Sequence, residues 1–290
     1  MRRVATRAVR WCAVVVVVCA LRHADAQNTW TGAGTTSLWS DPANWAGPPG
    51  TPVPPSTDAM LFFSGTSGTN SINDGAVSSV MAKVIGTNNG IVFSNDGLPG
   101  KTAGFRLSGS AITLKGYIET LSAVTSPAMT ITDEIANDLQ LTIADFTQIY
   151  TRTYGSFAHN LTISGVISQD GVPRTLRKGG TGGTLTLSGE NVFTGQMQIN
   201  VATVSVDRLE NVGQPSPLGA GNLPVRLSTG ALYGILQYTG TGETTNRYVQ
   251  VGSGPNTVAT GTGWVTANGS GPLVFTAVGR DMTHPLYGND

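Results

Sequence analysis

Carboxylates are the side chains of this 290-residue chain that could do chemistry, since two carboxyl groups at a fixed separation hydrolyse glycosides. The acids are nevertheless scattered, and most lie beside Gly, Asn, Ser or Pro, where aspartate usually forms turns. The densest group is Asp133, Glu134, Asp138 and Asp145. A catalytic or calcium-binding role is one hypothesis for this group, and a solvated turn face is the interpretation that we favour.

Other catalytic or metal-binding patterns are not found in the sequence. His159 and His284 stand far apart, and no set of His, Cys and carboxylates has the spacing of a zinc site. No Gly-x-Ser-x-Gly elbow occurs, and the glycine pairs around 178–183 lack the order of a phosphate-binding loop. We therefore expect no metal, no cofactor and no catalysis, and we keep a polysaccharide-active enzyme as an alternative.

Aromatic side chains offer a second kind of chemistry, the stacking of sugars. Trp30, Trp39 and Trp45 lie close together in a Trp- and Pro-rich segment, 27–65, which we predict to be an N-terminal cap module. Their rings could form a sugar-stacking platform, but a stacked β fold also needs a plug at its open end, and we favour that role. A second group could also bind sugars, although packing at the edge of a coil is favoured: Tyr150, Tyr154 and Phe157.

The first 26 residues have the order of a secretory signal peptide. An arginine-rich start is followed by an apolar run from Trp11 to Leu21 and by the small-x-small site Ala24-Asp25-Ala26. The apolar run has 11 residues, whereas a membrane-spanning helix needs about 20. We therefore predict cleavage after Ala26, a secreted or cell-surface protein, and no membrane span in the mature chain.

Removal of this segment changes the chemistry of the chain. Both cysteines, Cys12 and Cys19, lie within it, so the mature chain would hold no disulfide and no reactive thiol. The segment also carries five of the 17 basic residues and one of the 17 acidic ones, so a net charge of about −4 remains. A mildly acidic surface without basic runs argues against nucleic-acid binding.

The composition favours short strands joined by tight turns. Charged residues make up 12% of the chain, against about 25% in ordinary soluble domains. Thr, Val and Ile suit pleated, half-buried surfaces, and the 38 glycines suit turns with positive φ. Apolar residues alternate with Thr, Ser or Gln in many short segments, such as 140–143 and 196–200, which is the pattern of strands with one buried face.

One strand-like element recurs along the chain. Leu161-Thr162-Ile163-Ser164-Gly165 is matched 24 residues later by Leu185-Thr186-Leu187-Ser188-Gly189. Arg106-Leu107-Ser108-Gly109 is a fainter copy, and Leu141-Thr142-Ile143 precedes the first motif by 20 residues. Periods of this length in a strand-rich sequence predict a β-solenoid, in which each coil buries its inner face against the next.

An antiparallel β-sandwich is the alternative fold. Its hairpins would need two-residue turns, for which Asn89-Gly90 and Asp96-Gly97 are available.

Residues 176–200 resemble the autotransporter-associated β-strand repeat, with Phe193 where that repeat usually has tyrosine. The matching positions are Leu176, Lys178, Gly180, Gly182, Thr184, Leu185, Thr186, Leu187, Ser188, Gly189, Asn191, Phe193, Thr194, Gly195 and Ile199. The resemblance implies an all-β, right-handed, single-stranded parallel β-helix, like the passenger of a bacterial autotransporter, exported to or beyond the cell surface. On this basis we expect the solenoid to occupy residues 66–290 and to end in the middle of a coil.

The function that follows is structural. We expect a monomeric surface β-helix with an adhesion or display role, whose partner is a carbohydrate or another cell-surface ligand. The alternatives are a polysaccharide-active enzyme and a carbohydrate-binding protein on the same scaffold.

Overall fold

The computed structural model is described over much of the chain: 27–47, 54–66, 68–81, 89–95, 103–122, 129–154, 157–228, 233–252 and 261–277. The predicted signal peptide (1–26), Asp96-Gly97, His284 and the C-terminal end of the predicted solenoid lie outside these residues.

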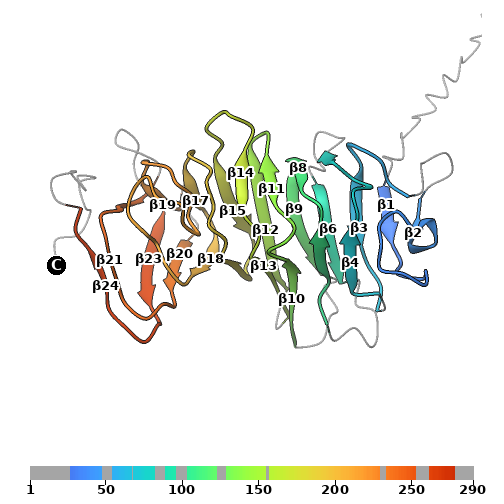
Figure 1. The fold of residues 1–290 in the computed structure, drawn as a ribbon. Helices are drawn as coiled ribbons and strands as arrows, with labels where there is room; N and C mark the ends of the chain where they lie inside the picture. Colours follow the sequence, from blue (N-terminus) through green and yellow to red (C-terminus); the bar gives the residue numbers. More distant parts are fainter. Residues whose placement is uncertain are drawn as a thin grey trace, which may run out of the picture.

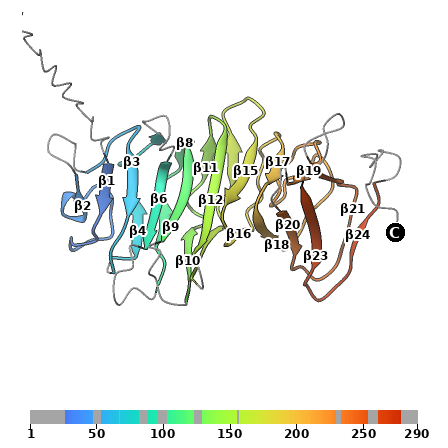
Figure 2. The same cartoon turned by 180° about the vertical axis from the view of Figure 1, so that it is seen from behind.

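The described chain winds into a stack of β coils, with about seven turns. Figures 1 and 2 show its strands side by side along the long axis, from β1 at one end to β23 and β24 at the other. The helical structure within the described ranges is one short 3-10 turn, η1 (Pro42–Asn44), which Asp41 caps through its side chain. The all-β class that the composition predicted is confirmed.

Each coil contributes one strand to each of up to three faces, which we call faces A, B and C. Within each face the strands pair in parallel. Face A consists of β1 (Gln27–Trp30), β3 (Met60–Phe63), β6 (Asn89–Asn95), β9 (Tyr117–Ser122), β12 (Thr147–Tyr154), β15 (Leu176–Gly180), β17 (Met197–Ile199), β19 (Val225–Leu227) and β22 (Val249–Val251).

Faces B and C complete the coils. Face B consists of β4 (Asn70–Asn73), β7 (Arg106–Gly109), β10 (Met129–Ile135), β13 (Phe157–Ile163), β16 (Thr184–Leu187), β18 (Ala202–Val206), β20 (Tyr233–Tyr238) and β23 (Thr262–Ala267). Face C consists of β5 (Ser79–Met81), β8 (Ile112–Lys115), β11 (Leu141–Ile143) and β14 (Ile167–Gln169), and farther along the chain of the pair β21 (Glu243–Thr245) and β24 (Leu273–Phe275).

This pairing excludes the antiparallel sandwich. Antiparallel contacts among the described strands occur where β2 (Trp45–Ala46) meets β1 and where the end of β12 meets β13. Asn89-Gly90, one of the two predicted hairpin turns, lies inside β6, where the register with β9 shifts by a bulge.

The register confirms the 24-residue repeat. Leu161 stacks on Leu185 and Ile163 on Leu187, so the two motifs occupy the same place in successive coils. Leu107 belongs to the same column, as its resemblance to the motif suggested. The buried column runs through Leu107, Ile135, Ile163, Leu187, Val206 and Tyr238.

The likeness of Leu141-Thr142-Ile143 to the motif at 161–163 is misleading. It forms β11 on face C, where Leu141 stacks between Ile112 and Ile167. The motif at 161–163 lies on face B. Both strands need the same alternation of apolar and hydroxyl residues because both have one buried side, so similar sequences here mark different faces of neighbouring coils.

The tryptophans of the predicted cap segment lie inside the first coils. Trp30 and Trp39 are fully buried, and Trp45 is 6% exposed. Trp45 meets Trp30 and Trp39 edge to face, with ring centroids 5.1 and 5.8 Å apart. Since β1 already pairs in parallel with β3, stacking begins within the segment 27–65. The rings therefore fill the N-terminal end of the core and present no exposed face on which a sugar could stack.

A long connection, residues 207–224, joins β18 to β19 and is held by the buried side chain of Arg247. Its Nε donates to the Leu209 carbonyl at 2.7 Å. Its Nη2 donates to the Gly219 carbonyl at 2.7 Å and to Ser216 Oγ at 3.0 Å. Burial lowers the pKa of this guanidinium. Arg247 thus supplements, with one side chain, the isolated antiparallel bridge between Ser216 and Asn191 that also holds this connection.

Candidate functional site

The densest acidic group does not form one site. Asp133 is buried, where it accepts the Phe105 backbone N–H at 2.8 Å and lies 2.5 Å from His159 Nε2. His159 Nδ1 lies 3.1 Å from the Leu121 carbonyl. Asp133 therefore links three coils from within, which corrects the interpretation of the whole group as a solvated turn face.

The other three acids of that group lie apart from Asp133 and on the outside. Glu134 alternates outward on the same strand and forms an ion pair with Arg106 at 3.2 Å, whereas Asp138 and Asp145 are exposed in turns. Across the described ranges, no group of three His, Cys, Asp or Glu side chains is placed to hold a metal ion.

The repeat-motif residues make contacts within and between coils. The Asn191 side chain accepts the Ile167 N–H at 2.7 Å and donates to the Pro217 carbonyl at 2.8 Å. A Cβ on Gly195 would lie 2.1 Å from the Arg174 carbonyl oxygen. Thr194, at the surface, accepts a hydrogen bond from Gln169, and Ser188 is half-buried. The remaining apolar side chains of the motif are buried in the core: Leu176, Leu185, Leu187, Phe193 and Ile199.

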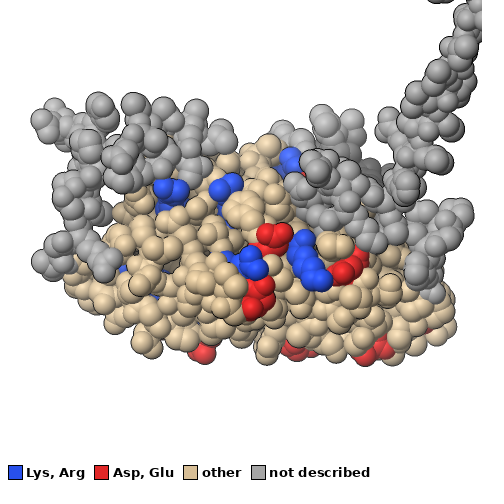
Figure 3. Space-filling view, turned by 90° about the horizontal axis from the view of Figure 1, so that it is seen from above, with Lys and Arg blue, Asp and Glu red and all other residues tan. Residues whose placement is uncertain are grey.

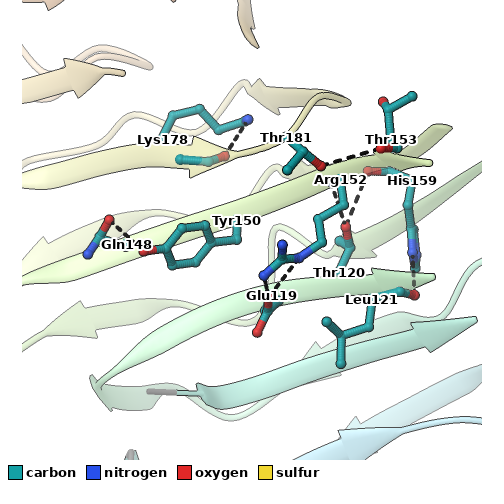
Figure 4. A network of polar contacts seen from close by, with 11 residues as sticks. Glu119, Thr120, Leu121, Gln148, Tyr150, Arg152, Thr153, His159, Lys178 and Thr181 are labelled. Atoms are coloured by element: carbon teal, nitrogen blue, oxygen red, sulfur yellow. Dashed lines mark hydrogen bonds and ion pairs between the residues drawn. The ribbon is translucent and has the colours of Figure 1, made fainter. Parts of the chain in front are cut away.

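Lys178 is the motif residue with the most unusual environment. Its side chain is fully buried, and its Nζ donates to the carbonyl of Gly179 at 2.8 Å (Figure 4). The same Nζ donates to the carbonyl of Val201 at 3.2 Å. Burial lowers the pKa of the ammonium group from 10.5 to about 7. Lys178 thereby ties β15 to the turn at Val201 in the next coil, at the expense of a desolvated charge.

Lys178 is expected to make stability rise with pH. Below pH 7 the ammonium is charged in both the folded and the unfolded chain, so its burial cost is fully present. Between pH 7 and about 10.5 the unfolded chain binds a proton that the folded chain has lost, so the free energy of unfolding rises by up to about 1.4 kcal/mol per pH unit. Urea unfolding from pH 6 to 9.5 should show this component in the wild type and not in Lys178→Met. Lys115→Met, at the surface, is the control and should keep the rise. An equal rise in the free energy of unfolding for the wild type and for Lys178→Met would contradict the prediction.

A row of polar and aromatic side chains follows the outer side of face A. We call it the outer ladder and define it as Tyr117, Gln148, Tyr150, Arg177 and Gln198. The parallel register places Gln148 beside Arg177 and Arg177 beside Gln198. Because side chains alternate along a strand, these residues point away from the core that Ile149, Lys178 and Ile199 enter.

Hydrogen bonds connect the ladder side chains across the strands. Gln148 Nε2 donates to the Tyr117 hydroxyl at 3.0 Å. The Tyr150 hydroxyl donates to Gln148 Oε1 at 2.9 Å (Figure 4). Farther along, Arg177 Nε donates to Gln198 Oε1 at 3.0 Å. These bonds fix the side chains of Tyr117, Gln148 and Tyr150 relative to one another and, separately, those of Arg177 and Gln198.

The two tyrosines form the aromatic end of the ladder. Their ring centroids lie 5.6 Å apart at an angle of 57°. Tyr150 lies over Gly179 of the next strand, where a Cβ would come within 2.8 Å of the ring. Burial raises the pKa of the Tyr150 hydroxyl, and the nearby Tyr117 and Glu119 raise it further. The hydroxyl therefore stays protonated and can serve as donor or acceptor.

Arg177 forms the cationic end of the ladder. Its guanidinium lies over the Phe146 ring, 4.5 Å from the ring centroid. Burial lowers the pKa of this group. Within the described part of the chain, no carboxylate pairs with Arg177 and its Nη groups donate no hydrogen bond. The ladder thus holds a half-buried positive charge with free donors.

One edge of the ladder is fixed by a separate ion pair. Arg152 pairs with the buried Glu119, and its guanidinium lies 5.8 Å from the Tyr150 ring centroid. The Arg152 backbone N–H donates to Thr120 Oγ1 at 3.2 Å, and Thr120 Oγ1 donates to the His159 carbonyl at 3.3 Å (Figure 4). The buried His159 network and the outer ladder are therefore held by the same strands, β9 and β12.

The aromatic group Tyr150, Tyr154 and Phe157, for which the sequence suggested sugar binding, does not form one surface. Tyr150 is half-buried on the ladder, Phe157 is fully buried with its ring 5.8 Å from His159, and the Tyr154 side chain lies outside the described residues. Tyr117, Gln148 and Arg177 were not expected. The alternation of Gln148, Tyr150 and Arg152 in the sequence could have indicated one outward-facing row.

Charged side chains elsewhere are sparse. Figure 3 shows lysine, arginine and acidic side chains gathered mainly near the middle of the face drawn there, with uncharged residues over most of the rest. A charge such as that of Arg177, which pairs with no carboxylate in the described ranges, therefore stands out against its surroundings.

The fold and the ladder define a passenger-like parallel β-helix with one organised outer surface. A stretch of 102 residues, 34% of this chain, is 37% identical to the adhesin BmaC autotransporter of Brucella suis biovar 1 (strain 1330). The chain spans about 3% of the length of that protein. No protein-family model and no solved structure matches the chain. Among the described residues, no helix is long and apolar enough to cross a membrane. The resemblance to an autotransporter passenger that residues 176–200 suggested is confirmed.

Proposed function

We propose that this chain is part of an exported, non-catalytic surface β-helix that adheres to ligands through the outer ladder. The observation that carries the proposal is the ladder itself, in which the Gln148 amide holds the hydroxyls of Tyr117 and Tyr150 and, on the next strand, Arg177 is held by its hydrogen bond to Gln198. The likeness of the chain to an autotransporter adhesin supports the same role.

The parallel stack suits this role mechanically. Each strand of face A is bonded to a strand on either side from β3 to β19, so the ladder lies on a continuous sheet instead of a mobile loop. A rigid surface loses little conformational entropy on binding. Many weak contacts along such a surface, or along several copies of it, give strong attachment by multivalency.

The alternative, a polysaccharide-active enzyme, needs two carboxyl groups about 5–10 Å apart. Around the outer ladder, within the described ranges, the acid nearest to the tyrosines is Glu119, which is buried and paired with Arg152. The ladder therefore supports binding better than hydrolysis.

Adhesion can be tested with the mature chain, residues 27–290, coupled to beads. We expect the coated beads to bind cultured epithelial cells in a saturable manner, and free mature protein to compete. Beads coupled to the same protein after heat unfolding are the control. Release of reducing sugars or unsaturated sugar products from plant or bacterial polysaccharides would overturn the non-catalytic part, and equal retention of native and unfolded beads would overturn adhesion.

A further inference from the structure

The starting point is the environment of Arg177. A charge removed from water is normally paired or fully hydrogen-bonded, because desolvation is costly. Arg177 is half-buried against Phe146, and its Nε is occupied by Gln198. Its two Nη groups remain available on the outer side of face A, because no carboxylate of the described residues forms an ion pair with them. A guanidinium in this state is suited to a bidentate contact with a carboxylate or a sulfate from outside.

A second arginine lies in the same row. Gln198 stands in register between Arg177 and Arg226 of β19, so two strand spacings, about 10 Å in total, separate the two arginines. The charge of Arg226 is close enough to lower the pKa of Arg177 further. Two neighbouring cations on one outer row repel each other, and an anion bound to Arg177 would offset that repulsion at Arg177.

The other end of the ladder is suited to uncharged hydroxyl groups. Tyr117 and Tyr150 present partly exposed rings and hydroxyl groups that can donate and accept hydrogen bonds, and the buried Gln148, whose amide bonds to both hydroxyls, holds them in place. Sugars present alternating hydroxyl groups and apolar ring faces, which these side chains match. The strands are about 4.8 Å apart, which is close to the length of one pyranose unit, so consecutive sugars could lie over consecutive strands.

We propose that the outer ladder binds an acidic oligosaccharide, with its carboxylate or sulfate group on Arg177 and its neutral sugar ring beside Tyr117 and Tyr150. This inference rests on the adhesive function proposed above and names the class of ligand. It requires both ends of the ladder, so neither a neutral glycan nor a simple polyanion satisfies it.

The test uses the mature chain and purified oligosaccharides of equal length. The probes are oligogalacturonate, which carries carboxylates, a heparin-derived oligosaccharide, which carries sulfates, a neutral cello-oligosaccharide, and inorganic polyphosphate. We expect one or both acidic glycans to bind by calorimetry, with an affinity that falls as salt is raised. The carboxylated and sulfated probes distinguish the two possible anionic groups.

Variants of Arg177 and Arg174 distinguish a loss of glycan binding from a loss of folding. Arg177→Met keeps the apolar stem and should weaken acidic-glycan binding about tenfold or more, while Arg177→Lys should recover only part of it, because lysine lacks the planar fork. Arg174→Met is the matched control, since Arg174 already pairs with Asp170 at 2.7 Å. Both methionine variants should unfold at the wild-type temperature, within a few degrees.

Three results would overturn the inference. They are equal affinity of Arg177→Met and wild type for the acidic glycans, neutral glycan binding as tight as acidic glycan binding, and polyphosphate binding as tight as that of either glycan. If coated beads still adhere to cells while no acidic glycan binds, the proposed adhesion stands and this inference fails.

Discussion

Replacing Arg247 with alanine is expected to lower the free energy of unfolding by about 3–5 kcal/mol, because several backbone carbonyls would lose their donor at about 1–3 kcal/mol for each one that stays buried. Arg247 is 3% exposed, and its guanidinium serves several backbone carbonyls of the connection 207–224. Without it, those carbonyls would be buried without donors or would have to move into water. We expect the connection to detach before the rest of the stack unfolds.

Urea unfolding followed by circular dichroism, together with limited proteolysis, measures the two parts of this effect. Arg247→Lys should fall between wild type and Arg247→Ala, because an ammonium group has three donors and no planar fork. Arg208→Ala is the control, since Arg208 forms a surface ion pair with Asp207 at 3.2 Å, and such pairs contribute at most about 1 kcal/mol. If Arg247→Ala and Arg208→Ala are equally stable and equally resistant to protease at 207–224, the role of Arg247 as an anchor is wrong.

The second large effect is expected at Gly180. Its φ of +108° is one that other residues rarely adopt, and an added Cβ would lie 2.0 Å from the Thr151 carbonyl oxygen of the preceding coil. Gly180→Ala must therefore strain the backbone and push two paired strands apart. We expect a loss of about 3–5 kcal/mol, from about 1–3 for the φ strain and a similar amount for the overlap.

Gly171 provides a matched control for Gly180. It has a similar φ of +89°, but no atom lies within 4 Å of the position of an added Cβ. Gly171→Ala should thus show the φ strain alone, and the difference between the two variants should measure the close approach of the coils. Equal thermal unfolding temperatures for the two variants would show that contact with Thr151 has no energetic consequence.

The repetitive part of the fold could be predicted from the sequence because burial on one side of a strand imposes a period of two. The motifs at 161–165 and 185–189 revealed both a strand and the number of residues that separates it from the strand stacked on it. β15 was not expected as a strand, since Lys178, Gly179 and Gly180 have low strand propensity. β15 is a strand because β12 and β17 of the neighbouring coils pair with it, and the strand propensity of its own residues carries no information about those partners.

The outer ladder was harder to predict for a related reason. Its members come from four strands, and their proximity depends on a register that places Gln148 beside Arg177 and Arg177 beside Gln198. Tyr150 was considered for sugar binding together with Tyr154 and Phe157, and packing at the edge of a coil was favoured. Arg177 was treated as part of a repeat, and its lack of an acidic partner becomes visible only when the surrounding strands are in place. Asp133 was misjudged because its partner, His159, lies 26 residues away.

The stacking of Leu161 on Leu185 also has a consequence for how such a chain could change in length. Because each strand pairs within its face only with the strands of neighbouring coils, a duplication or deletion of one complete 24-residue unit would preserve this pairing on both sides of the junction. The rod would grow or shrink by about 4.8 Å, and the rows on its three faces would stay in phase. The length of the rod and the chemistry of its outer faces could therefore evolve as separate traits, the first by a change in the number of coils and the second by exchange of outward side chains.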